Sequence, residues 1–323
     1  MRLLQKLVSG IVLACSVFAV AAQTDAGYPN RPIKWIVSYP PGGTTDLLAR
    51  LVGQYLSQRL GQQVIVDNRA GGGNNIGTEM AVKAAPDGYT VFLVNPANAI
   101  NATLYRNLPF VFLNDMVPVA GLTRVPNVMT VPKNFPAKNV AEFIDYGKKN
   151  PDKINMASSG AGTSVHLSGE LFKYMTGISM KHIPYKGAGP AITDLIGGQV
   201  DVLFDNMPSI IGHIRGGQLR ALGVTSAQRS PALPDVPAVA ETVPGYEASA
   251  WFGMAAPKGT PAAVIERLNR EVNAVLADPA IKAKLADLGG LPLPGTPDQF
   301  WAIHKMETEK WAKIVQFSGA KVD

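Results

Sequence analysis

Two short segments of the chain combine glycine with hydroxyl side chains at the start of an expected helix. The first runs from Ser38 to Asp46 (SYPPGGTTD), and the second runs from Ser158 to Ser164 (SSGAGTS). Each follows a short apolar run typical of a strand and precedes apolar residues at helical spacing. A strand, a glycine turn and a helix start present free backbone N–H groups and the positive end of a helix dipole to one place. Such a place binds anions.

The side chains of both segments suit an uncharged anion site, since they offer short hydrogen bonds and small turns. For a single turn, glycine would only indicate a tight bend, but two matched turns favour contact with a ligand. We expect Asp46 to cap its own helix or to pair with the helix dipole, because a carboxylate facing an anion would repel it. The candidate ligand-binding residues from this pattern are Ser38, Gly42, Gly43, Thr44, Ser158, Ser159, Gly162, Thr163 and Ser164.

Other chemistry is poorly supported by the motifs. Gly43 is followed by Thr44, so the Gly-Lys-Ser/Thr of a phosphate-binding loop is absent. Ile76 stands where a dinucleotide fingerprint needs its third glycine. Ser164 lacks the glycine that a nucleophile elbow needs two residues later, because His166 occupies that position. We therefore predict no catalytic residue, no metal ligand and no cofactor.

The N-terminus indicates export. Arg2 and Lys6 precede an uncharged apolar run from Leu7 to Val20, and small residues follow it. This pattern predicts a signal peptide over residues 1–22 and a periplasmic location. A retained membrane anchor and a lipid-modified Cys15 are the alternatives. Cys15 is the only cysteine, so a processed chain would hold no disulfide.

Length and charge point to two lobes and to no nucleic-acid partner. The 323-residue chain has a formal net charge of +6, without a long basic block, and 46% hydrophobic residues. Alternating strands and helices predict an α/β protein with largely parallel sheets. Two crossings, near residues 117–130 and near Trp251, predict discontinuous lobes: 27–124 plus 247–323 as lobe 1, and 125–246 as lobe 2. We expect a polar loop at Asn95–Asn101, and a helical C-terminal tail that packs on lobe 1.

At these motifs the chain resembles a known family, the tripartite tricarboxylate transporter receptors, or Bug-type extracytoplasmic solute receptors. The resemblance covers essentially all of the expected mature chain. It rests on the following segments: 28–33 (YPNRPI), 39–46 (YPPGGTTD), 67–77 (DNRAGGGNNIG), 86–90 (PDGYT), 159–163 (SGAGT), 184–187 (PYKG), 195–205 (LIGGQVDVLFD), 251–253 (WFG) and 256–261 (APKGTP).

The resemblance implies a two-lobed type II periplasmic-binding-protein fold with a ligand cleft between the lobes. It implies a small organic carboxylate, mono- or dicarboxylate, held by backbone amides and ordered waters, and a membrane permease as the partner of a monomer. By position, it adds Tyr39, Asn95, Asn98 and Asp205 to the ligand-binding residues. The segment after the third expected strand departs from the family's usual pattern, so the identity of the carboxylate stays open.

Two other functions remain to be considered. A periplasmic sensor that presents its loaded form to a two-component kinase would use the same binding chemistry. A secreted hydrolase acting on esters of such acids would need a Ser-His-Asp set, and the sequence offers none that is convincing.

Overall fold

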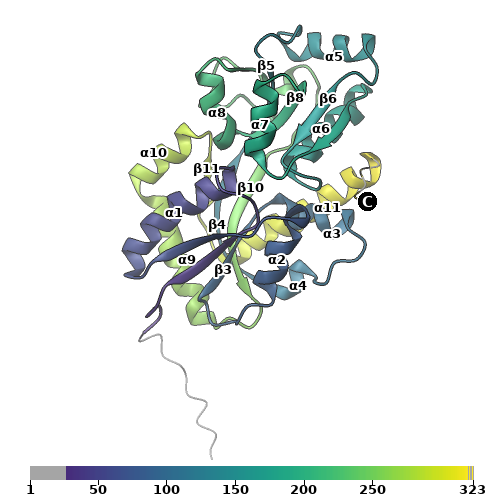
Figure 1. Cartoon of the computed structure of the whole chain (residues 1–323). Coiled ribbons are helices and arrows are strands. Elements are labelled where there is room, and N and C mark those ends of the chain that lie inside the picture. The colour runs from purple at the N-terminus through teal and green to yellow at the C-terminus, as the bar shows by residue number, and fades with distance from the viewer. Residues whose placement is uncertain (1–26, 319, 321, 323) are drawn as a thin grey trace, which may run out of the picture.

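The computed structural model describes residues 27–318, 320 and 322. The expected signal peptide lies outside the described residues. The described chain forms two α/β lobes, each built on its own sheet (Figure 1). None of its described helices is long and apolar enough to cross a membrane.

The sheet of lobe 1 has six strands. Their spatial order is β11 (Leu291–Pro292), β4 (Met116–Val125), β10 (Ala250–Pro257), β3 (Thr90–Val94), β1 (Ile33–Val37) and β2 (Val64–Asn68). The helices of this lobe are α1 (Thr44–Leu60), α2 (Asn75–Val82), α3 (Pro96–Leu104), α4 (Phe112–Asp115), α9 (Ala262–Ala277), α10 (Pro279–Asp287) and α11 (Pro297–Ser318), with a 3₁₀ turn at Gly72–Asn74. Helix α1 ends at Gly61, whose φ of 66° confirms the expected glycine stop.

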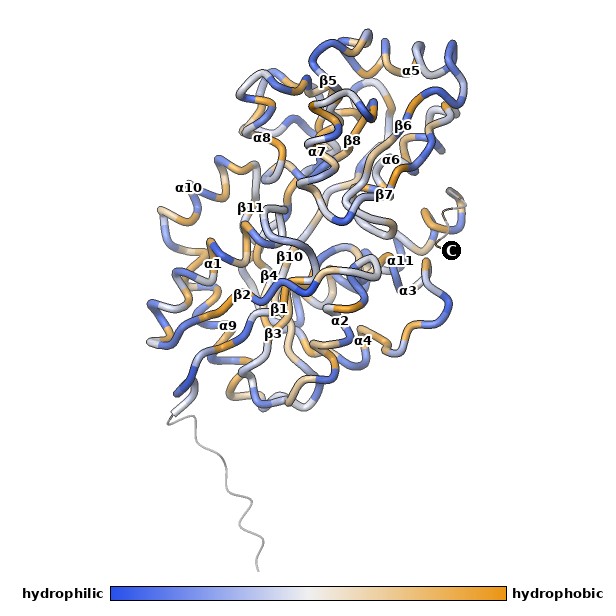
Figure 2. The backbone as a smooth tube through the Cα atoms, viewed as in Figure 1, coloured by the Kyte–Doolittle hydropathy of each residue, from blue (hydrophilic) through white to orange (hydrophobic). Residues whose placement is uncertain are grey.

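The sheet of lobe 2 has five strands. Their spatial order is β7 (Lys181–Pro184), β6 (Asn155–Ser158), β8 (Val202–Asn206), β5 (Asn127–Pro132) and β9 (Leu219–Val224). The helices of this lobe are α5 (Val140–Lys149), α6 (Ser164–Thr176), α7 (Ala188–Ile196) and α8 (Met207–Arg215), with a 3₁₀ turn at Val239–Glu241. Hydrophobic and hydrophilic residues alternate along the helices of both lobes, as expected for helices that cover a sheet (Figure 2).

The sheets are mixed, which corrects the expectation of largely parallel ones. Strand β1 runs parallel to β2 and β3, but β10 is antiparallel to both of its neighbours, β3 and β4. In lobe 2, β5 is likewise antiparallel to β8 and β9. The reason is the chain path: β5 enters lobe 2 and β10 returns to lobe 1, and each strand joins its sheet in the reverse direction.

The two crossings between the lobes lie side by side. One is Pro126, between β4 and β5, and the other follows β9 and ends at β10. Their backbones are joined by hydrogen bonds: Thr225 N donates to Asn127 O at 2.9 Å, and Ala248 N donates to Thr225 O at 3.1 Å. Adjacent crossings allow the lobes to move about one narrow region.

Helix α11 connects the lobes from outside the crossings. We expected the C-terminal tail to pack on lobe 1, and α11 does contact α3 and β4, but it also packs on α6 of lobe 2. The ring of Phe317 stacks on Tyr174 of α6 with centroids 5.9 Å apart. One apolar cluster therefore continues from Trp251 in lobe 1 through Trp311 of α11 to Phe172 in lobe 2.

Candidate functional site

Both glycine turns lie where a helix begins at the edge of its sheet. The first turn follows β1 and opens α1 at Thr44, and the second follows β6 and opens α6 at Ser164. The two helix starts face the same cavity between the lobes. Because the first N–H groups of a helix have no acceptor inside the helix, both helices can direct donors and positive dipole ends into this cavity.

The cavity comprises about 430 Å³ of space between the atoms, part of which is open to solvent. Its described lining contains no Lys, Arg or His, and Asp205 is its one acidic side chain. The residues that line it are Tyr39, Pro40, Gly43, Thr44, Thr45, Asn95, Pro96, Ser159, Thr163, Ser164, Ala188, Asp205, Asn206, Ser209 and Phe252. Recognition of a ligand there depends on neutral hydrogen-bonding groups and helix ends.

The first turn is held by a carboxylate. Asp46 Oδ2 accepts a hydrogen bond from Gly42 N at 3.0 Å, and Asn68 Nδ2 donates to Asp46 Oδ1 at 3.0 Å. Arg50 pairs with the same carboxylate at 2.9 Å. Burial raises the pKa of Asp46, but hydrogen bonds from Arg50, Gly42 and Asn68 outweigh it and lower the pKa below its ordinary value. Asp46 thus lies in the first turn of α1, where a negative charge suits the helix dipole, but it does not cap the helix, whose N-cap is Gly43 without a side-chain bond. Asp46 does not line the cavity.

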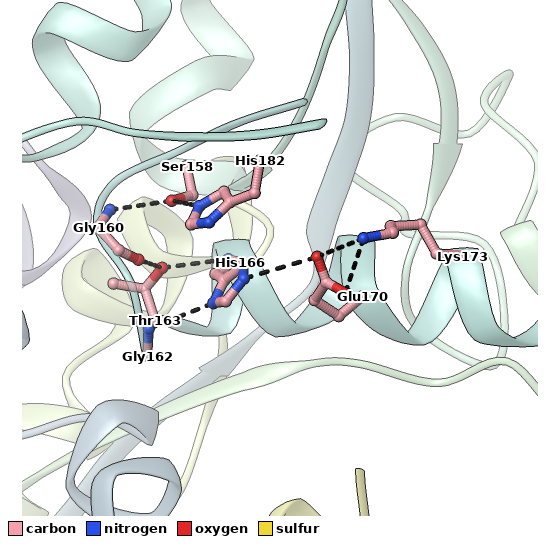
Figure 3. A network of polar contacts seen from close by, with 8 residues as sticks. All are labelled: Ser158, Gly160, Gly162, Thr163, His166, Glu170, Lys173 and His182. Atoms are coloured by element: carbon pink, nitrogen blue, oxygen red, sulfur yellow. Dashed lines mark hydrogen bonds and ion pairs between the residues drawn. The ribbon is translucent and has the colours of Figure 1, made fainter. Parts of the chain in front are cut away.

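The second turn is held by imidazole groups (Figure 3). Gly162 N donates to His166 Nδ1 at 3.3 Å, and His166 N donates to Thr163 Oγ1 at 3.1 Å. Since Nδ1 accepts this bond, His166 carries its proton on Nε2, which faces Glu170 Oε1 at 3.6 Å. Lys173 pairs with Glu170 at 3.0 Å.

A second histidine supports the same turn from the neighbouring strand. His182 of β7 stacks on His166 with ring centroids 3.8 Å apart, and its Nε2 lies 2.6 Å from Ser158 Oγ. Burial, and the neighbouring His166, lower the pKa of His182 to about 3, so its ring is neutral near pH 7. Ser158 is buried and does not line the cavity. The Ser158–His182 contact therefore positions the turn.

A buried amide network fixes the wall of the cavity in lobe 1. Asn95 Nδ2 donates to Asn74 Oδ1 at 2.9 Å, and Asn74 Oδ1 also accepts a short hydrogen bond from Ser38 Oγ. Asn98 Nδ2 donates to Thr78 Oγ1 at 3.1 Å. Ser38, Asn95 and Asn98 are predicted ligand-binding residues, and Asn74 lies in a neighbouring motif. Most polar atoms of these side chains form hydrogen bonds within the network.

The expected polar loop at Asn95–Asn101 is wrong, because this segment forms helix α3. Asn95 accepts from Ala97 N at 3.1 Å, and Asn98 Oδ1 accepts from Asn95 N at 3.0 Å. This reciprocal capping, with Pro96 at the first helical position, starts a helix where the polar composition indicated a loop. Asn98 consequently lies inside the helix and does not line the 430 Å³ cavity.

The structure brings eight of the thirteen predicted ligand-binding residues to the cavity. They are Tyr39, Gly43, Thr44, Asn95, Ser159, Thr163, Ser164 and Asp205. The other five support the wall instead: Ser38 and Asn98 in the amide network, Gly42 through Asp46, and Ser158 and Gly162 through the two histidines.

Sequence reasoning missed two further helix starts at the cavity. Ala188 begins the first turn of α7, and Ser209 lies in the first turn of α8. The glycine turn at Gly187 and the Asn206-Met207-Pro208 sequence could have indicated them, because ligands of open α/β sheets bind at the carboxyl ends of strands. Other missed lining residues are Pro40, Pro96, Asn206 and Phe252.

The two lobes touch each other around the cavity. Thr44 Oγ1 of α1 donates to Ser209 Oγ of α8 at 3.2 Å. A Cβ on Gly43 would lie 3.8 Å from Ala188 Cβ, whereas a Cβ on Gly162 would lie 2.2 Å from Asn101 Oδ1 of lobe 1. The structure therefore shows closed lobes, and glycine at position 162 permits that closure.

A larger hollow of about 980 Å³ adjoins the cavity and shares Tyr39, Pro40 and Ser159 with it. Ser38 and Lys186 line this hollow, together with the glycine turn of residues 71–73. Lys186 therefore lines the adjoining hollow and not the inner cavity. No group of His, Cys, Asp or Glu among the described residues is arranged to hold a metal ion.

Two α/β lobes that enclose a cavity at their strand ends define the type II periplasmic-binding-protein fold. Residues 48–319 match the tripartite tricarboxylate transporter family receptor, and the chain belongs to this family. It is 40% identical over 318 residues to protein BugT of Bordetella pertussis, covering 98% of this chain and 97% of BugT.

Solved structures agree in fold over most of both chains. Rpa4515 of R. palustris, determined with adipate, is 37% identical with a TM-score of 0.89, covering 91% of this chain and all of Rpa4515. MatC from Rhodopseudomonas palustris, determined with bound malate, is 31% identical with a TM-score of 0.85, covering 89% of this chain and all of MatC. Two structures similar to this chain have thus been determined with a carboxylate, adipate in one and malate in the other.

Proposed function

We propose that this chain is a periplasmic receptor that captures a small organic mono- or dicarboxylate and delivers it to the membrane permease of a tripartite tricarboxylate-type transporter. The observation that carries the proposal is the cavity where α1 and α6 begin on opposite sides. Helix N-termini and neutral donors suit a carboxylate, and similar proteins have been determined with adipate and with malate.

The proposed contacts follow the geometry of the cavity. The N–H groups at the starts of α1 and α6 bind the carboxylate, helped by the hydroxyl group of Ser164, because Thr44 and Thr163 donate their hydroxyl hydrogens to Ser209 and to the Gly160 carbonyl oxygen. Enclosure strengthens such bonds, because competing water is excluded. A dicarboxylate would extend its second group toward α7 or α8, which also begin at this cavity.

Closure about the two crossings is part of the proposal. We infer that lobe 1 comprises 27–124 plus 247–323 and lobe 2 comprises 125–246, with a hinge where the crossings lie side by side. The hydrogen bonds between Thr225, Asn127 and Ala248 support this division. A monomer of this kind presents the permease with a surface that exists only in the loaded, closed form.

A thermal-shift screen followed by calorimetry tests the proposal. The panel contains monocarboxylates, linear dicarboxylates including adipate and malate, tricarboxylates, and the corresponding amides as neutral controls. A ligand that binds only the folded state stabilises it by about 2.7 kcal/mol at a hundredfold excess over Kd. Binding of a carboxylate but not of its amide supports the proposal, and a protein that binds no carboxylate contradicts it.

A further inference from the structure

The most unusual group in the cavity is a buried acid. Asp205 lies at the end of β8, is 1% exposed, and lines the cavity that both helix starts face. A carboxylate ligand would bring a second negative charge to the same small space. Two carboxylates so close together cannot both stay ionised without a large energetic cost. The surroundings of Asp205 show how that cost is avoided.

The hydrogen bonds around Ser209 are best satisfied when Asp205 carries a proton. Ser209 Oγ lies 3.2 Å from Thr44 Oγ1, 2.5 Å from Asp205 Oδ2 and 2.9 Å from the Asn206 carbonyl oxygen. A hydroxyl has one hydrogen and two lone pairs, and a carbonyl only accepts. If Asp205 is ionised, the single Ser209 hydrogen can serve only one of its two acceptors. If Asp205 is protonated, it donates to Ser209, and Ser209 donates to Asn206.

No described cation of the cavity compensates an ionised Asp205. The cavity lining lacks Lys, Arg and His, and its other ionisable side chain, Tyr39, has a pKa raised by burial. Strands β5 and β6, which flank β8, carry no ionisable residue. Burial raises the pKa of Asp205 to about 6, although Ser209, Asn206 and the more distant His213 of α8 oppose the shift.

The charged residues on the neighbouring helices are occupied elsewhere. Asp46 of α1 pairs with Arg50 at 2.9 Å. Asp194 of α7 accepts from Tyr185 Oη at 2.6 Å. The charged cluster of α6, His166, Glu170 and Lys173, holds together by its own contacts. Asp205 is left facing the ligand space with hydroxyl and amide neighbours only.

Asp205 also connects to both ligand-binding turns. Its partner Ser209 receives the Thr44 hydrogen bond from α1, and the adjacent Asn206 Nδ2 donates to Ser164 Oγ of α6 at 3.2 Å. We propose that binding of a carboxylate in this cavity is coupled to the uptake of one proton by Asp205, so that the protein loads its ligand together with a proton. This inference rests on the proposed function and specifies the charge state of the loaded site.

Calorimetry in buffers of different ionisation enthalpy measures the proton directly. Adipate, malate and the best ligand of the panel are titrated at pH 7.5 into the full chain lacking its signal peptide. For wild type we expect close to one proton taken up per ligand bound, and an affinity that falls about tenfold per pH unit above pH 7. In Asp205→Asn, which is permanently neutral, we expect no uptake, a flat pH profile and affinity at least equal to that of wild type at pH 8.

Two controls keep the outcome clear. Asp287→Asn removes a surface carboxylate that pairs with Arg215 at 2.8 Å, and this variant should keep the proton uptake of wild type. Infrared difference spectra of loaded minus free wild type should show a new protonated-carboxyl band, a measurement that does not depend on the folding of any variant. Circular dichroism checks that the Asp205→Asn variant is folded.

Each result either supports or overturns the inference. Carboxylate binding without proton uptake, and without the infrared band, overturns the inference and leaves the proposed function intact. Loss of binding in a folded Asp205→Asn also overturns it, since that result would mean that an ionised Asp205 accepts a hydrogen bond from the ligand. If no carboxylate of the panel binds, the proposed function itself fails, and this inference fails with it.

Discussion

The two glycine turns have the same design but are held in different ways. In lobe 1 an ionised carboxylate, Asp46, receives Gly42 N–H and is itself paired with Arg50. In lobe 2 an imidazole ring, that of His166, receives Gly162 N–H and is stacked on His182. The same local task, fixing a turn so that the helix N–H groups stay free, is thus performed by a carboxylate on one side and by imidazole rings on the other.

The two turns also differ in how closely the opposite lobe approaches them. Gly43 has a φ of −84°, and a Cβ there would make only ordinary contact with Ala188. Gly162 has a φ of 79°, and a Cβ there would overlap Asn101 of lobe 1. The second turn is therefore the tighter constraint on closure, and substitutions in it should have larger effects on binding than equivalent ones in the first.

The largest effect is expected for Gly162→Ala. The added methyl would lie 2.2 Å from Asn101 Oδ1 when the lobes are closed, and overpacking of this kind costs about 1–3 kcal/mol. Ligand affinity should fall by at least about tenfold. Gly43→Ala is the matched variant, and its affinity should change by less than about threefold. Titration calorimetry on both proteins, after melting curves show that they are folded, measures the difference; equal losses would contradict the asymmetry.

The next largest loss of ligand affinity is expected for His166→Ala. Removing the imidazole leaves Gly162 N–H without its acceptor, and an unsatisfied buried donor costs about 1–3 kcal/mol. We expect affinity to fall about three- to tenfold. His166→Asn is the matched variant, because its Oδ1 can occupy the place of Nδ1 and should recover most of the loss. If Asn and Ala behave alike, the ring acts through stacking and not through the Gly162 hydrogen bond.

Much of this arrangement could be predicted from the sequence, since it is local. The turns, the helix that stops before Gly61 and the place of Asp46 in the first turn of its own helix all follow from residues close together in the chain. Helix α3 was also locally encoded by Asn95, Pro96 and Asn98, but the polar composition obscured it. Strand pairing was not predictable in this way, because the antiparallel β10 joins segments more than a hundred residues apart.

The site shows the same division between local and long-range information. Thr44 and Ser164 could be named because each begins its own helix after a glycine turn. Ser209 could not be paired with Thr44, since the two residues lie 165 positions apart in the chain and belong to different lobes. The support of the second turn through Ser158, and through the stack on His166, depends on His182, which belongs to another strand.

The histidine support of the second turn predicts sensitivity to acid. His182 has a pKa of about 3 in the folded protein against 6.5 for the free side chain, so the unfolded chain binds the extra proton between these values. The contribution of neutral His182 to the free energy of unfolding is therefore fully present above pH 6.5. It is lost as the pH falls, by up to about 3 kcal/mol at pH 4. His304, whose pKa burial lowers to about 4, acts in the same direction.

Denaturant unfolding of wild type and His182→Gln between pH 7 and pH 4 measures this contribution. The free energy of unfolding should fall less steeply with acid in the variant. His213→Gln, which changes an exposed histidine of α8 that contacts Gln218, should follow wild type. Parallel curves for wild type and His182→Gln would mean that protonation of His182 is not what weakens the protein in acid.

The smallest effect on ligand affinity is expected for the hydrogen bond between Thr44 of lobe 1 and Ser209 of lobe 2. Thr44→Val keeps the shape of the side chain but removes the donor to Ser209 Oγ, a bond of 3.2 Å. A neutral hydrogen bond contributes about 0.5–1.5 kcal/mol, so affinity should fall by about two- to tenfold. Thr193→Val, on the exposed side of α7, is the matched control and should bind as wild type does.

A double-mutant cycle with Ser209→Ala shows whether the loss comes from this bond. If the bond links the lobes, Thr44→Val should cost little in a background that already lacks the Ser209 hydroxyl. The coupling should appear in ligand affinity and not in the stability of the free protein, because the open form has no such contact. An additive cycle would show that Thr44 acts only on the ligand, and that closure is held by the ligand and the backbone turns alone.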